Sequence, residues 1–159
     1  MSCIIIFFCF FFDVVDIIKN ETSKFQRVVN LGKSDINSIT FSLSLKSDTT
    51  LNVFIKPNSN YTGNIKITTK KGNTLTSYTA EKQEDGRYKV TIPNIIPHQL
   101  GDMYNVTAET NNGTATCSLS ALSYVYAILN GSSYDKTAKD AVSSLYKYYE
   151  ATMNYRSKS

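Results

Sequence analysis

The sequence predicts one β-sandwich of the immunoglobulin-like type followed by a C-terminal αα-hairpin, a mainly β fold with α-structure at its end. From residue 39 to residue 119, apolar side chains recur at every second position in short runs, which is the period of half-buried strands. Turn residues separate these runs about every 8–12 positions, giving about seven strands. After Ser120 the apolar spacing changes to three and four, the helical period. An open barrel or OB-type fold is the alternative for the β part.

The first strands are predicted from three runs of alternation. Residues 39–45 place Ile39, Phe41, Leu43 and Leu45 on one face, and polar residues 47–50 make a turn. Residues 51–55 alternate again, and the polar stretch 58–60 is a loop. Residues 65–67 form the next run, and a hairpin turn at 71–73 leads to residues 75–80. That last run reads as an edge strand with a polar face.

Three further strands complete the predicted sandwich. A turn at 84–86 precedes residues 88–92, and Pro93 ends that strand. Pro93, Pro97 and Gly101 indicate a long crossing loop, after which residues 104–108 and 115–119 alternate on either side of a turn at 111–113. Asp102 and Tyr104, at the start of a late strand, suggest a tyrosine corner in which the Tyr104 hydroxyl bonds to backbone.

The helical hairpin is predicted from residue 120 onward. Residues 122, 125, 126 and 129 mark one helical face, and Asn130–Gly131 suggests a left-handed cap. Ser132 or Ser133 can cap the second helix, with Asp135 in its first turn. Its apolar stripe comprises Ala138, Ala141, Val142, Leu145, Tyr149 and Thr152. Neither helix is expected to be stable alone, so the stripes must dock on the sandwich, on a preceding domain or on a partner.

The N-terminal segment, residues 1–31, is predicted to be an apolar leader and an irregular stretch before the sandwich (32–119) and the hairpin (120–159). Residues 3–12 are an unbroken apolar run, shorter than the roughly 20 residues that span a bilayer, so no stable membrane span is expected. The run can be an atypical export signal, a misassigned start or a buried strand. Two short elements are expected at 14–18 and 25–29.

Composition argues against several kinds of functional site. The net charge of +4 comes from scattered lysines, whereas a nucleic-acid binder concentrates them on one element. His98 is the only histidine, and no nucleophile-turn motif accompanies it, so we expect no catalytic residues. Of the three cysteines only Cys117 falls in the domain, where it faces the core, so neither a disulfide nor a zinc site is expected.

Metal and cofactor sites are likewise not expected. Four carboxylates can supply oxygen ligands to calcium, but their spacing does not match a calcium-binding loop. We interpret them as surface charges: Glu81, Glu84, Asp85 and Asp102. No residue is predicted to bind a cofactor.

Tyrosines are concentrated in the helical hairpin, on more than one face of its helices. One interpretation is that they pack the hairpin onto the sandwich with their hydroxyls in water. The other is an interaction face, because tyrosine buries a large area at low entropic cost. The candidate residues for that face are Tyr124, Tyr126, Tyr146, Tyr148, Tyr149 and Tyr155.

Residues 32–156 resemble a module of large surface or secreted proteins of anaerobic, mostly Gram-positive gut bacteria, some of which carry leucine-rich repeats. The resemblance lies in GKSDINSITFSLSLKSDTTLNVFIKP, DGRYKVTIPNIIPHQLGDMYNV and ALSYVYAILNGSSYDKTAKDAVSSLYKYYEATMNYR. It implies a C-terminal unit made of an Ig-like domain and a helical hairpin.

These observations together predict a non-catalytic structural or interaction module rather than an enzyme. The resemblance implies a secreted or cell-surface location and a terminal position in a larger protein, with a preceding domain or a surface protein as partner. A carbohydrate- or peptide-binding β-sandwich is the alternative function.

Overall fold

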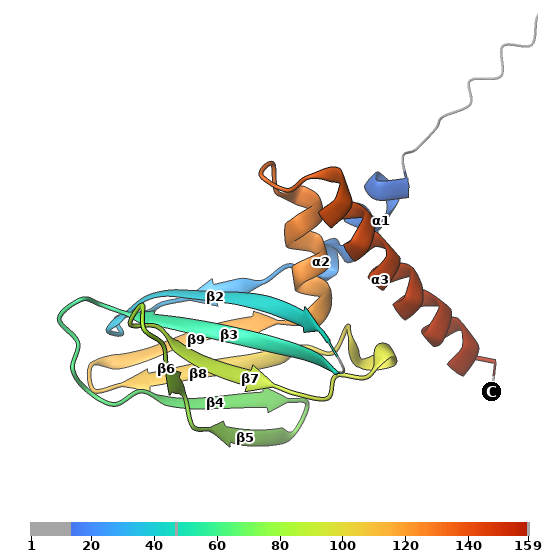
Figure 1. The fold of residues 1–159 in the computed structure, drawn as a ribbon. Helices are drawn as coiled ribbons and strands as arrows, with labels where there is room; N and C mark the ends of the chain where they lie inside the picture. Colours follow the sequence, from blue (N-terminus) through green and yellow to red (C-terminus); the bar gives the residue numbers. More distant parts are fainter. Residues whose placement is uncertain (1–13, 47, 159) are drawn as a thin grey trace, which may run out of the picture.

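A computed structural model describes residues 14–46 and 48–158 and shows two antiparallel sheets packed face to face, with helices at one end (Figure 1). The five-stranded sheet has the order β1 (Val28–Asn30), β9 (Gly113–Leu119), β8 (Tyr104–Thr110), β4 (Lys66–Lys71) and β5 (Thr74–Tyr78). The four-stranded sheet has the order β2 (Ile36–Leu45), β3 (Thr49–Pro57), β7 (Tyr88–Ile92) and β6 (Glu81–Lys82). The predicted β-sandwich followed by a helical hairpin is confirmed.

The order of the strands matches that of an immunoglobulin-like sandwich. The four-stranded sheet, read as β2-β3-β7-β6, corresponds to strands A-B-E-D of that fold. The other sheet, read as β9-β8-β4-β5, corresponds to strands G-F-C-C′. β1 adds a fifth strand by pairing with β9 through Val29 and Cys117. The five-stranded sheet therefore includes residues from the segment before position 32.

The core lies between the sheets and follows the predicted alternation. Leu51, Val53 and Ile55 of β3 are fully buried, as are Val106 on β8 and Leu119 on β9. Cys117 faces this core at 1% exposure, as predicted.

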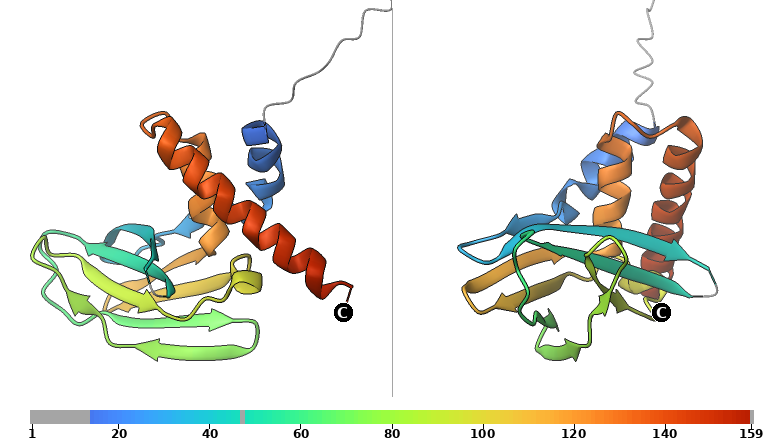
Figure 2. Two further views of the ribbon diagram at one scale, coloured as in Figure 1. Left: turned by 45° about the vertical axis from the view of Figure 1, so that its right-hand side comes forward. Right: turned by 60° about the vertical axis from the view of Figure 1, so that its left-hand side comes forward.

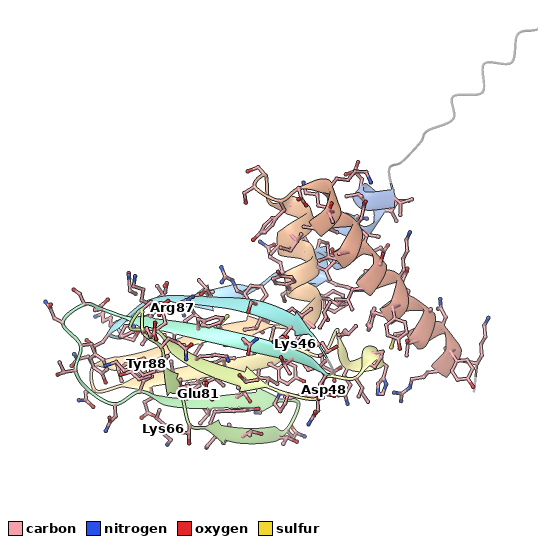
Figure 3. All side chains as sticks on the ribbon, in the orientation of Figure 1. Lys46, Asp48, Lys66, Glu81, Arg87 and Tyr88 are labelled. Carbon is pink, nitrogen blue, oxygen red and sulfur yellow. The ribbon has the colours of Figure 1, made fainter. Side chains whose placement is uncertain are left out.

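The C-terminal end of β2, the first strand predicted from the sequence, does not contribute to the core. Leu45, predicted to face the core, is instead 55% exposed, because it is the last residue of edge strand β2, just before Lys46 (Figure 3). β3 begins at Thr49, two residues before the predicted start at Leu51, and Ser47 of the predicted turn lies outside the described residues.

Two of the predicted turns depend on glycine. Lys71 pairs with Thr74 across a two-residue loop that contains Gly72, whose φ is 56°. Gly86, with a φ of 78°, lies in the turn between β6 and β7 and donates its N–H to the Gln83 carbonyl at 3.0 Å. Positive φ values cost glycine no steric strain, which explains the position of both residues.

The residues before the sandwich form α1 (Val14–Thr22) and the 3₁₀ helix η1 (Ser23–Phe25), which leads into β1. The two short elements expected at 14–18 and 25–29 correspond to α1 and β1. Residues 3–12, with their three possible interpretations, lie outside the described residues. Within the part that is described, no helix is long and apolar enough to cross a bilayer.

The C-terminal hairpin consists of α2 (Ala121–Asn130) and α3 (Lys136–Arg156). Ser120 caps α2 by accepting from the Ser123 N–H at 3.2 Å, while the Ser123 hydroxyl accepts from the Ser120 N–H at 2.8 Å. The helix ends at Asn130 as predicted, but the predicted left-handed cap is wrong because Gly131 has a φ of −74°. A Cβ at Gly131 would instead meet the Tyr134 ring, at 2.5 Å.

Asp135, rather than Ser132 or Ser133, caps α3. Its carboxylate accepts from the Ala138 N–H at 2.8 Å, and the helix begins one residue after it. A carboxylate at this position satisfies a free N–H and also complements the positive end of the helix dipole.

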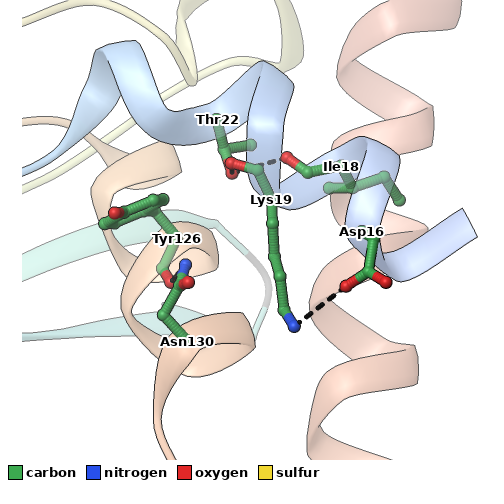
Figure 4. A network of polar contacts seen from close by, with 6 residues as sticks. All are labelled: Asp16, Ile18, Lys19, Thr22, Tyr126 and Asn130. Atoms are coloured by element: carbon green, nitrogen blue, oxygen red, sulfur yellow. Dashed lines mark hydrogen bonds and ion pairs between the residues drawn. The ribbon is translucent and has the colours of Figure 1, made fainter. Parts of the chain in front are cut away.

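The hairpin docks on the end of the sandwich and on α1 (Figure 2). The Ser123 hydroxyl donates to the Phe25 carbonyl in η1, and the Leu122 N–H donates to the Leu100 carbonyl in the crossing loop at 3.0 Å. Figure 4 shows α1 beside α2, with the Thr22 hydroxyl bonded to the Ile18 carbonyl at 2.7 Å. The apolar side of α2 is thus covered by parts of this chain.

Candidate interaction surfaces

Three of the six candidate tyrosines pack against the rest of the molecule: Tyr146 is buried, and Tyr124 and Tyr149 are half-buried. Tyr146 is only 4% exposed, and burial raises its pKa to about 12. Tyr124 meets Phe41 of β2 edge-on with ring centroids 6.1 Å apart, and Tyr149 meets Phe25 in the same way at 6.4 Å. These contacts attach the hairpin to the sandwich and to η1.

The other three candidates differ in exposure. Tyr126 is half-buried on α2, whereas Tyr148 and Tyr155 are 58% and 77% exposed on α3. Seven residues separate the last two, so they lie on the same side of the helix. We call Tyr148 and Tyr155 the α3 surface.

The buried face of α3 is rotated from the predicted stripe. Ala141 is exposed, whereas Val142, Ser143 and Tyr146 are buried. The sequence alone did not show this rotation, because the position of α3 depends on its contacts with α1 and with the 3₁₀ helix η2 (Pro97–Gln99).

Tyr104 lies at the start of β8 and is 6% exposed. The Lys71 ammonium lies 5.6 Å from its ring centroid and forms a 2.9 Å ion pair with Asp102. Burial raises the pKa of the Tyr104 hydroxyl, and the hydrogen bond with Asp102 raises the pKa of Lys71. No hydrogen bond from this hydroxyl to backbone is found among the described residues, so the tyrosine corner stays a prediction.

His98 and the four carboxylates do not form a metal-binding group among the described residues, although Glu84 and Asp85 line the same hollow. His98 lies half-buried on η2, and the Asp102 carboxylate is paired with Lys71 instead. Asp85 pairs with Arg87 at 2.6 Å near the tip of the β6–β7 turn, where Figure 3 labels Arg87, and the hydrogen bond from the Arg87 N–H lowers the Asp85 pKa. Residues 14–46 and 48–158 contain no group of three His, Cys, Asp or Glu placed to hold a metal ion.

Asp35 joins three loops. Figure 1 shows the β1–β2 loop, the β3–β4 loop and the β8–β9 turn at the end of the sandwich opposite the helices. Its carbonyl accepts from the Asn58 N–H at 2.7 Å, and its own N–H donates to the Thr110 hydroxyl at 3.4 Å. Its Oδ1 accepts from the Asn112 amide at 2.9 Å. Asp35 therefore connects the β1–β2 loop to the β3–β4 loop and to the β8–β9 turn.

A polar hollow of about 470 Å³ lies against these loops, which we call the loop-end pocket. It is lined by Asp35, Asn58, Asn60, Tyr61, Thr62, Gly63, Asn111 and Asn112. Sequence analysis missed it, because its residues come from three separate loops and match no spacing motif. The one available signal was the concentration of asparagines in those loops.

A second hollow, of about 340 Å³, is lined by two tyrosines, Tyr61 and Tyr88, together with Lys56, Lys82 and Asp85.

Comparison with protein-family models, with curated proteins and with solved structures finds no match to this chain. Its function is therefore inferred from its own residues.

Proposed function

We propose that this chain is a non-catalytic structural or interaction module of a cell-surface or secreted protein, and a terminal piece of a longer polypeptide. The observation that carries the proposal is the α3 surface. Tyr148 and Tyr155 project from a helix whose other side is anchored by Tyr146 and Tyr149. Exposed aromatic side chains on a rigid support are typical of contact surfaces. The resemblance of residues 32–156 to a surface-protein module supports the proposed location.

The partner that best fits the α3 surface is an adjoining domain of the same polypeptide, because exposed apolar side chains of α1 lie beside α3. Val14 and Ile17 on α1 are 50% and 49% exposed, and α1 packs against α3. Val14 and Val15 share a shallow hollow with Ser144 and Lys147 of α3. A domain preceding α1 would lie next to these apolar side chains.

The proposal is tested with antibodies raised against the purified chain and applied to cells of its source organism. We expect signal in the medium or on intact cells, removed by external protease, while a cytosolic marker stays protected. We also expect an immunoblot band well above 17.8 kDa, the mass of this chain. Signal only after lysis would contradict the location, and a single band at the mass of this chain would contradict the terminal-piece proposal.

A carbohydrate- or peptide-binding sandwich is the second candidate, favoured by the hollow that Tyr61 and Tyr88 line. Aromatic rings beside lysine and aspartate side chains can stack on a sugar and bond its hydroxyls. A glycan array and a peptide library test this, with Tyr88→Ala expected to abolish any binding and Tyr148→Ala to leave it unchanged. Binding that survives Tyr88→Ala would rule this hollow out.

A further inference from the structure

One carboxylate oxygen at the loop end of the sandwich lacks a partner. Within the described part of the chain, Asp35 Oδ2 is the only buried side-chain nitrogen or oxygen without a hydrogen bond. Nearly all buried polar atoms in proteins are bonded to protein or to ordered water, and an unbonded charged oxygen is more costly than a neutral one. A group that the chain itself does not supply is therefore expected beside Oδ2.

The charge of Asp35 is also not balanced by a neighbouring side chain. The five ion pairs found among the described residues do not include it. Bonds to Asn58 and Thr110 hold the Asp35 backbone, and the Asn112 amide holds the carboxylate through Oδ1, so turning the carboxylate toward water would break its contact with the β8–β9 turn. A positive ligand would both neutralise it and bond to Oδ2.

The loop-end pocket adjoins this carboxylate and contains residues that carry neutral oxygen atoms. Besides Asp35, the lining residues with a side-chain amide or hydroxyl include Asn58, Asn60, Thr62, Asn111 and Asn112. Carboxylate and amide oxygens are the ligands that calcium takes, whereas zinc and copper select histidine and cysteine. We propose that the loop-end pocket binds a calcium ion, with Asp35 as its charged ligand and asparagine carbonyl oxygens completing the shell.

Calcium fits this pocket better than magnesium for two reasons. Calcium accepts six to eight oxygens in irregular geometry, which side chains from three loops can provide, whereas magnesium requires a near-ideal octahedron. The pocket also contains one carboxylate, and so low a ligand charge corresponds to the weak affinities of extracellular modules, with Kd about 10⁻⁴–10⁻³ M. Rotation of the Asn112 amide would direct its oxygen, instead of its NH₂, toward the ion.

The calcium site does not depend on the proposed function, since it rests on Asp35 and its neighbours alone. Its failure would leave the antibody and immunoblot outcomes unaffected.

Terbium luminescence on the purified full chain tests the site directly. Tyr61 lines the pocket, and the chain has no tryptophan, so tyrosine excitation will sensitise a terbium ion bound there. We expect saturable luminescence that calcium displaces with a Kd of about 10⁻⁴–10⁻³ M, together with a higher melting temperature in calcium than in chelator. Magnesium is expected to produce neither effect at the same concentration.

Two variants distinguish the pocket from adventitious binding. Asp35→Asn is expected to weaken calcium binding at least about tenfold, because it removes the charged ligand. Asn60→Ala, which alters an exposed side chain of the pocket, is expected to weaken binding without lowering the melting temperature of the calcium-free protein. Asp85→Asn, in the neighbouring turn, is the matched control and should bind as the original chain does.

Three results would overturn the proposal: no calcium-dependent shift in luminescence or melting, equal effects of magnesium and calcium, or unchanged affinity in both pocket variants. If Asp35→Asn fails to fold, Asn60→Ala alone decides. If an ordered water rather than an ion satisfies Asp35 Oδ2, neither luminescence nor melting will depend on calcium, which is the first of these results.

Discussion

The guanidinium Nη1 of Arg27 donates a 2.8 Å hydrogen bond to the Ile39 carbonyl oxygen, on the open edge of β2. The same guanidinium lies 5.3 Å from the ring centroid of Phe41. β2 has ten residues and no charged side chain, while β1, β5 and β6, the other edge strands, are shorter. Long uncharged edges readily pair with other chains, so Arg27 protects the most vulnerable edge of this sandwich.

Arg27→Ala is expected to lower the free energy of unfolding by about 1–2 kcal/mol, because the Ile39 carbonyl and the Phe41 ring both lose a cationic partner. It should also cause concentration-dependent association through the exposed edge. Urea denaturation measures the first effect and light scattering the second.

Arg87→Ala is the matched control for that edge. Arg87 lies 4.4 Å from the Phe54 ring centroid, and β3, which carries Phe54, is paired on both sides. Its loss should therefore leave the protein monomeric. Equal association of the two variants would show that Arg27 has no special role.

The strands were predictable because each depends on local sequence. Alternation alone places Leu51, Val53 and Ile55 in the core, and turn chemistry places Gly72 and Gly86 between strands.

Contacts between distant segments were not predictable in this way. α1 and β1 have short, mixed sequences, and their structures depend on packing against α2 and pairing with β9. The buried face of α3 and the loop-end pocket depend on residues far apart in the chain. Periodicity does not encode such contacts, which is why Tyr146 could not be separated from Tyr148 beforehand.

Tyr146→Ala is expected to destabilise the protein by about 3 kcal/mol, because it leaves a cavity between the hairpin and its neighbours. Tyr148→Ala should change stability by less than about 0.5 kcal/mol, because its ring is already in solvent. Chemical denaturation of the two variants, which differ by two positions on one helix, provides the comparison. A similar loss in both would mean that the position of α3 is misassigned.

Stability is expected to fall as the pH rises from 10 to about 12. Burial raises the Tyr146 pKa from 10.0 to about 12, so the folded state retains a proton that the unfolded chain loses above pH 10. The contribution is complete below pH 10 and disappears as the pH approaches 12. The raised pKa of Tyr104 acts in the same direction. Tyr146→Phe should flatten the dependence, measured as the denaturation midpoint against pH, and an unchanged slope would contradict this assignment.

Cys117 is expected to be unreactive in the folded protein. Its side chain is 1% exposed, and burial raises its pKa from 9.0 to about 11, so little thiolate exists at pH 8. In a chain with Cys3 and Cys9 changed to serine, a thiol reagent should react at least about 100-fold more slowly with native than with unfolded protein. Rapid modification of the native form would show that the core between β8 and β9 opens readily.

Removal of residues 120–159 is expected to lower the melting temperature sharply, because α2 covers part of the core with Leu122, Val125, Ile128 and Leu129. The deletion uncovers Phe25 and Leu100, which are buried in the intact chain. Removal of residues 154–159 is the matched control: residues 154–158 at the end of α3 and after it are exposed, so the melting temperature should change little. Circular dichroism on heating measures both. An unchanged melt after the larger deletion would mean that the sandwich is stable without α2, and that the hairpin is attached to it rather than part of its core.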